Sequence, residues 1–223
     1  MSISALVCLL LVLLTTALVW RDATQVMLNK LKTERAFQHI TFAVIVIYWA
    51  LWSAEAGVKA GLAIHFLGLT SLTLMYGWRS AFALSLPITL LMTLLGPLNW
   101  YEIPEFLVFS ALVPILISYS VFLLSYHYLP RNIFVFIFVA GFINGALTGT
   151  LHLLVNSIYY LLVTDYDWQT IYNNYLMFTP LLAFPEGLIN GMAAAMLTVF
   201  KPELLRVFSD RDYIYNHYHN NDE

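Results

Sequence analysis

The sequence has few charged residues and a single cysteine. Asp, Glu, Lys and Arg together make up 10% of the 223 residues, whereas hydrophobic residues make up 61% and the mean hydropathy is +0.76. A chain of this length with so little charge cannot form a soluble domain, so we expect a polytopic membrane protein whose apolar surface faces lipid. The one cysteine, Cys8, excludes an internal disulfide and a CxxC-type zinc site.

The sequence also lacks the motifs of several function classes. It has no GxxxxGK[ST] loop, so any ATP hydrolysis must come from a partner protein. Its net charge is −3 and no basic patch alternates with aromatic residues, which argues against a nucleic-acid partner. It has no HxxH-type cluster and no serine or cysteine in a recognisable nucleophile setting. We therefore expect no enzymatic activity, and an integral membrane metalloenzyme is the weakest hypothesis.

Long apolar runs predict an all-α membrane bundle of about seven transmembrane helices. No Lys or Arg precedes the first run and no clear cleavage site follows it, so we interpret it as a retained span rather than a signal peptide. The sixth run is much longer than the ~20 residues that cross the hydrocarbon layer. It is either one tilted helix or a helix broken after Gly149, and we favour one crossing because no charged turn divides it. The expected spans are residues 3–20, 40–56, 60–76, 80–98, 106–126, 133–163 and 175–200.

The basic residues are unevenly distributed over the predicted loops. With the N-terminus outside, nine of the ten Lys and Arg residues fall in inner loops or the C-terminal tail, and only Lys59 falls outside. This distribution follows the positive-inside rule, and the acidic outer loops would suit cations. We expect one transmembrane domain at residues 1–205, with a surface connector at 21–39. A cytoplasmic tail follows at 206–223, in which the stretch 217–219, His-Tyr-His, is expected to be solvated.

Three ionisable side chains fall in the outer half of the predicted membrane region: His65, His152 and Glu186. Asn190 lies one helical turn after Glu186 on the same face. Imidazole and carboxylate groups bind divalent transition metals, so one interpretation is a metal or proton site formed by these four residues. The other is structural, because a buried histidine often bonds a backbone carbonyl and burial can keep a glutamate protonated. The sequence leaves both interpretations open.

Glycine recurs at helical spacing in the same two spans. Gly141, Gly145 and Gly149 form a doubled GxxxG face, and Gly187 with Gly191 forms a single one. Such faces let helix backbones approach closely. We expect them to serve packing within the chain, with docking of a partner protein as the alternative.

Three blocks of the sequence resemble the cobalt and nickel substrate-binding components of energy-coupling factor transporters, the cobalamin-biosynthesis M family. The third block is the most telling, since the family closes with a Glu-Gly pair entering a helix that ends in Pro-Glu-Leu-Leu. The blocks are IHFLGLTSLTLMYGWRSAFAL at 64–84, LPRNIFVFIFVAGFINGALTG at 129–149 and FPEGLINGMAAAMLTVFKPELL at 184–205.

The resemblance implies a multi-pass protein of the bacterial cytoplasmic membrane, embedded in the lipid bilayer. Such a protein would capture a divalent transition metal (Co, Ni or Zn) as its substrate on the outer face and deliver it inward. It would work with a separate transmembrane coupling subunit and with cytoplasmic ATPases.

The chain departs from this family pattern at its start. The resemblance implies metal ligands at an N-terminal Met-His and at a histidine in a later span, whereas this sequence begins Met-Ser-Ile. His65 best matches the internal ligand. Either His152 and Glu186 replace the missing ligands, or the substrate is different. A membrane scaffold or assembly protein without transport activity is the alternative function, favoured if neither a metal nor an ATPase co-purifies.

Overall fold

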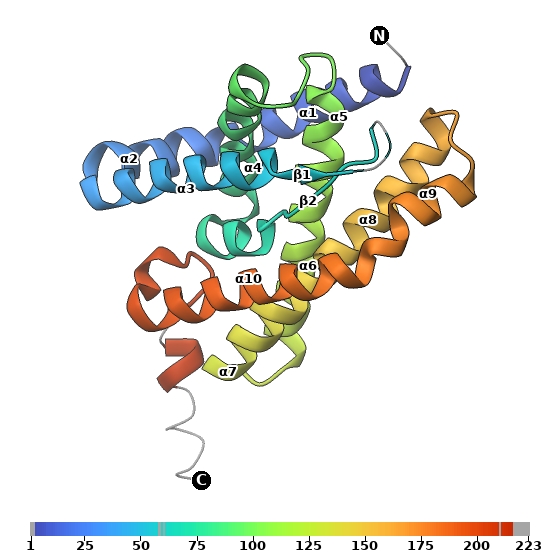
Figure 1. Cartoon of the computed structure of the whole chain (residues 1–223). Helices are drawn as coiled ribbons and strands as arrows, with labels where there is room; N and C mark the ends of the chain where they lie inside the picture. The colour runs from blue at the N-terminus through green and yellow to red at the C-terminus, as the bar shows by residue number, and fades with distance from the viewer. Residues whose placement is uncertain (1–2, 58, 60, 210, 216–223) are drawn as a thin grey trace.

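The computed structural model describes residues 3–57, 59, 61–209 and 211–215, and most of this part is helical. Figure 1 shows a bundle of long helices from which one short hairpin projects, so the predicted all-α membrane class is confirmed. The helices are α1 (Ile3–Asp22), α2 (Leu28–Thr33), α3 (Arg35–Ser53), α4 (Leu69–Leu95), α5 (Ile103–Phe106), α6 (Val113–Tyr128), α7 (Ile133–Val135), α8 (Asn144–Val163), α9 (Trp168–Asn174) and α10 (Thr179–Phe200). The strands are β1 (Glu55–Ala56) and β2 (Ile64–His65).

Several helices continue into one another through wider, π-helical turns. These turns are Ala23–Met27, Leu107–Leu112 and Phe136–Ile143. A 3-10 turn at Leu176–Phe178 joins α9 to α10. Six continuous helices in the described part are long and apolar enough to cross a membrane: Ile3–Thr33, Arg35–Ser53, Leu69–Leu95, Ile103–Tyr128, Ile133–Val163 and Trp168–Phe200. The prediction that 133–163 forms one unbroken crossing is confirmed.

The predicted surface connector at 21–39 is helical over most of its length. The first helix continues through this segment to Thr33, and the chain breaks only at Glu34, whose backbone is extended. No Gly or Pro interrupts residues 21–33, so nothing in the local sequence stops the helix at the membrane surface. Residues 21–33 therefore prolong the first helix, and α3 begins directly after the break; the place of this segment at the membrane surface stays a prediction.

The predicted third span, at 60–76, is not a separate helix. It begins with the antiparallel hairpin of β1 and β2, continues in irregular backbone through Gly68, which is left-handed, and becomes helical at Leu69. Hydrophobic content alone cannot distinguish a buried extended segment from a helix, which is why the run was misread.

Residues 64–76 nevertheless lie antiparallel to α3 along most of its length. The Trp52 indole N–H, near the end of α3, donates to the Leu67 carbonyl (2.8 Å). The Thr41 hydroxyl, near the start of α3, pairs with the Tyr76 hydroxyl (3.1 Å). An extended residue advances about 3.3 Å and a helical one about 1.5 Å, so residues 64–76 reach about as far as the ~30 Å hydrocarbon layer.

Helix α4 contains a sharp break at Gly77, where the backbone has φ 73° and ψ 159°. The part after the break runs back toward the end of α3. Its direction follows from Gly96, which lies beside Ser53. The predicted spans 60–76 and 80–98 thus meet at Gly77 within α4. Counted as long helices, the described part has six crossing elements rather than seven; counted as passes between the two ends of the bundle, the chain makes seven.

The start of α1 and the segment after α10 lie at opposite ends of the bundle (Figure 1). Near the start, the Ser4 hydroxyl donates to Glu105 at the beginning of α5 (3.1 Å). At the other end, the Arg206 guanidinium donates to both Asp22 oxygens (2.8 and 3.0 Å). The first part of the predicted tail packs on the bundle there, with Tyr213 buried. The stretch 217–219 lies outside the described residues.

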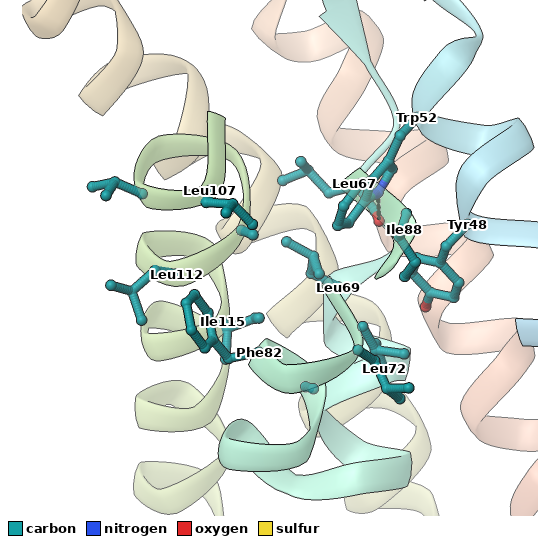
Figure 2. Close-up of a cluster of buried hydrophobic side chains, with 14 of the residues drawn as sticks. Tyr48, Trp52, Leu67, Leu69, Leu72, Phe82, Ile88, Leu107, Leu112 and Ile115 are labelled. Atoms are coloured by element: carbon teal, nitrogen blue, oxygen red, sulfur yellow. Dashed lines mark hydrogen bonds between the residues drawn. The ribbon is translucent and has the colours of Figure 1, made fainter. Parts of the chain in front are cut away.

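A hydrophobic core joins α3, both parts of α4, and α6 with the turn before it. Figure 2 shows the Trp52 indole beside Leu67 at the upper right of this cluster, with Tyr48 and Leu72 below them and Ile115 across the cluster on α6. The core holds the irregular segment before α4 in place, and that segment carries His65.

Candidate functional site

Two of the predicted site residues, His65 and His152, lie against each other. Their ring centroids are 5.9 Å apart and the rings are inclined at 69°. His65 comes from β2 and stacks on Phe106 at 5.6 Å, whereas His152 comes from α8. Both are buried, with 8% and 2% of their surfaces exposed. The structure therefore brings the two histidines together.

The ring nitrogens of His152 already have partners. Nδ1 lies 3.1 Å from the Phe109 carbonyl, which can only accept, so Nδ1 carries the proton. The Asn156 side-chain nitrogen lies 3.1 Å from both ring nitrogens, and because Nδ1 is protonated only Nε2 can accept from it. His152 is thus held in one tautomer between two neighbours.

His65 differs from His152 in this respect. Its Nε2 is buried and has no hydrogen-bond partner among the described residues. Buried polar atoms are normally paired, so such an exception calls for an explanation. His65 lines a cavity of about 430 Å³ together with the carboxylate residues Glu55, Glu102 and Glu105. The lining of the cavity therefore combines one histidine, whose buried Nε2 is unpaired in the described structure, with three acidic residues.

The hairpin places one of these carboxylates beside His65. In the antiparallel pairing of β1 and β2, Glu55 is the direct partner of His65, and directly paired residues point to the same face of the ladder. Partial burial, together with the nearby Glu102 carboxylate, raises the pKa of Glu55 above its ordinary value. Acidic residues are thus concentrated around the cavity, where their negative charge favours a cation.

The other predicted pair, Glu186 and Asn190 on α10, contacts the backbone instead. Glu186 accepts hydrogen bonds from the Leu67 N–H (3.0 Å) and the Gly68 N–H (2.6 Å). The Asn190 side-chain amide donates to Glu186 (3.0 Å), and its carbonyl oxygen accepts from the Ser71 N–H and hydroxyl (2.7 and 2.8 Å). Both side chains are almost fully buried, at 1% and 0% exposure. Their contacts therefore lie at the start of α4.

The four predicted ligands thus form two pairs, one of histidines and one of Glu186 with Asn190. Within residues 3–57, 59, 61–209 and 211–215, no three His, Cys, Asp or Glu side chains come together as a metal-holding group. The two pairs are joined through the chain, because His65 precedes Leu67 by two residues. The assignment of all four as ligands of one ion stays a prediction.

Comparison with known proteins settles the family. Residues 1–204 match the family model CbiM, described as the cobalt uptake substrate-specific transmembrane region. The chain belongs to the CbiM family. No curated protein and no solved structure matches it. The resemblance stated from the sequence is confirmed, and the six crossing helices agree with a multi-pass component of cobalt uptake, which is a transporter family and not an enzyme family.

In this CbiM chain the glycine faces serve internal packing, as expected. An added Cβ at Gly141 would lie 2.9 Å from Ala194, and one at Gly191 would lie 2.9 Å from the Phe142 Cβ. At Gly149 it would meet the Glu186 Cγ at 3.0 Å. These glycines let α10 lie directly on α8 and the turn before it, and this close approach brings Glu186 to the start of α4.

Sequence reasoning missed the backbone groups of the CbiM site. The Phe109 carbonyl and the N–H groups of Leu67 and Gly68 carry no sequence signature, because every residue has them. The available signal was Gly68, a glycine directly before a helical run. Its left-handed conformation (φ 62°) turns the chain from the hairpin into α4.

Proposed function

We propose that this CbiM chain is the substrate-binding membrane component of an uptake system for a divalent transition metal ion of the cobalt type. The observation that carries the proposal is the unpartnered, buried Nε2 of His65 at the acidic cavity. A neutral imidazole nitrogen beside carboxylates is a donor set suited to Co²⁺, Ni²⁺ or Zn²⁺. His65 is the first ligand of the ion.

Two neighbours complete the binding site in this proposal. Glu55, paired with His65 across the hairpin, supplies a carboxylate oxygen. His152, whose ring meets His65 at 5.9 Å, supplies a second imidazole when the Asn156 amide releases its Nε2. The ion enters through the cavity mouth, where Glu102 adds negative charge.

The cavity end of the bundle faces outward in this proposal, because the opposite end carries nine of the ten basic residues. The membrane is the bacterial cytoplasmic membrane. Energy for delivery to the inside comes from separate cytoplasmic ATPases acting through a coupling subunit, since the chain has no nucleotide-binding loop of its own. The scaffold alternative is weakened because the glycine faces are occupied within the chain.

Metal retention tests the proposal directly. The wild-type protein, His65→Ala, His152→Ala and the control His127→Ala are purified in detergent, loaded separately with Co²⁺, Ni²⁺ or Zn²⁺, desalted and measured by elemental analysis. His127 is exposed and lies at the end of α6, at the end of the bundle away from the cavity. Loss of a ligand should weaken binding at least tenfold in His65→Ala, more than in His152→Ala, with no change in His127→Ala. A wild-type protein that retains none of the three ions contradicts the proposal.

A further inference from the structure

The start of α4 is held by side chains of another helix. The first N–H groups of a helix have no partner within it, and Gly68, which precedes α4, has no side chain to cap them. The oxygens of Glu186 and Asn190 accept from three backbone N–H groups there: those of Leu67, Gly68 and Ser71. In a membrane an unpaired N–H is costly, so this contact fixes the backbone at this point.

The same contact fixes the place of His65. The chain runs from His65 in β2 to Gly68, where the left-handed bend occurs, in three residues. The Leu67 carbonyl accepts from the Trp52 indole on the side of α3 (2.8 Å), while its N–H donates to Glu186 on the side of α10. This short segment is therefore tied on both sides.

We infer that Glu186 and Asn190 position the segment that carries His65 and are not ligands of the ion. The inference rests on the proposed function and goes beyond it, because it separates the residues that bind the metal from those that place the binding residue. It also gives the Glu-Gly pair of α10 a role: Glu186 reaches α4 while Gly187 allows the close approach of α8 to α10.

The chemistry requires a carboxylate at this position. One Glu186 oxygen accepts from Leu67, and the other accepts from both Gly68 and Asn190. Both oxygens act only as acceptors. A glutamine of the same shape would turn an N–H group toward one of these donors, so two donors would face each other and the segment would shift.

The test compares Co²⁺ affinity with the absorption spectrum of the bound ion. Affinity is measured by isothermal titration in detergent for the wild-type protein, Glu186→Gln and Asn190→Ala, and the cobalt d–d spectrum is recorded at saturation. Thr198→Val is the matched control, because Thr198 is a buried polar residue of α10 whose hydroxyl bonds only to Ala194 within the helix in the described structure. Residues that position ligands alter metal affinity by roughly 10–100-fold, and we expect Glu186→Gln to bind Co²⁺ at least tenfold more weakly.

The spectrum distinguishes positioning from ligation. We expect saturated Glu186→Gln to give the wild-type spectrum, since the ligands are unchanged, and Thr198→Val to keep both affinity and spectrum. Unchanged affinity in Glu186→Gln, or a changed spectrum at saturation, overturns the inference. If Glu186→Gln does not fold, Asn190→Ala decides, because it removes the cap on Ser71 and one donor to Glu186; wild-type affinity in that variant also overturns it. A wild-type protein that binds no Co²⁺ instead refutes the proposed function.

Discussion

At the residue scale, the two histidines of the site differ in what their ring nitrogens contact. His152 is held by the Phe109 carbonyl and the Asn156 amide, whereas the His65 Nε2 lacks a partner in the described part of the chain. This difference makes His65 the better candidate for a ligand that binds first. In the proposed site, His152 is the second ligand and binds after Asn156 releases its Nε2.

Glu55 provides the sharpest single-residue prediction of the proposed site. Glu55→Gln removes the carboxylate that the hairpin pairs with His65, and we expect Co²⁺ affinity to fall about tenfold as a result. Isothermal titration in detergent measures the change. Glu34→Gln is the control. Glu34 is exposed, lies directly before the start of α3 and pairs with Lys30. Equal affinity in the two variants would remove Glu55 from the site.

Part of the site could be predicted from the sequence, because the position of a residue along a span indicates its depth in the membrane. Counting placed His65 and His152 in the same half of the membrane, and the structure brings their rings into contact. The sequence could not reveal the partners of Glu186, because a carboxylate is expected to pair with an ionisable side chain. The actual partners include the backbone N–H groups of Leu67 and Gly68, and no residue pattern marks these.

At the element scale, the break at Gly77 lets α4 turn back toward the end of α3. Its backbone lies in a region that is open almost only to glycine. A Cβ there would also lie 3.2 Å from the Arg206 side chain. Both the backbone conformation and the packing of Arg206 thus favour glycine at position 77.

Replacing this glycine should therefore destabilise the bundle. We expect Gly77→Ala to lower the free energy of unfolding by about 1–3 kcal/mol, as measured by SDS titration in mixed micelles. Gly61→Ala is the comparison, because Gly61 also has positive φ (78°) but an added Cβ there would meet no described atom within 4 Å. A loss in Gly77→Ala no larger than that in Gly61→Ala would show that contact with Arg206 adds nothing.

The helices that the sequence predicted well are those for which the length of an apolar run is enough to predict a continuous helix. The unbroken run at 133–163 is continuous because no residue in it stops a helix, even with three glycines present. The run at 60–76 is also apolar, but tertiary contacts with Trp52 and Glu186 stabilise a non-helical path before Leu69. Local hydrophobicity carries no information about such long-range partners.

At the scale of the whole molecule, the bundle has two chemically different ends. One end carries the cavity with Glu55, Glu102 and Glu105, and the chain begins there. The other carries the bidentate pair of Arg206 with Asp22 and the turn at Gly77. This polarity suits a protein that takes up a cation at one membrane face and releases it at the other.

The direction of this polarity can be tested by labelling from outside the cell. In a Cys8→Ala background, Lys59→Cys places a thiol on the hairpin at the cavity end, and Arg131→Cys places one after α6 at the other end; both positions are exposed. If the cavity faces outward, a membrane-impermeant maleimide added to intact spheroplasts labels the first variant, and it labels the second only after the membrane is permeabilised. The opposite pattern would place the acidic cavity on the cytoplasmic side, where it would suit the export of a cation and contradict uptake.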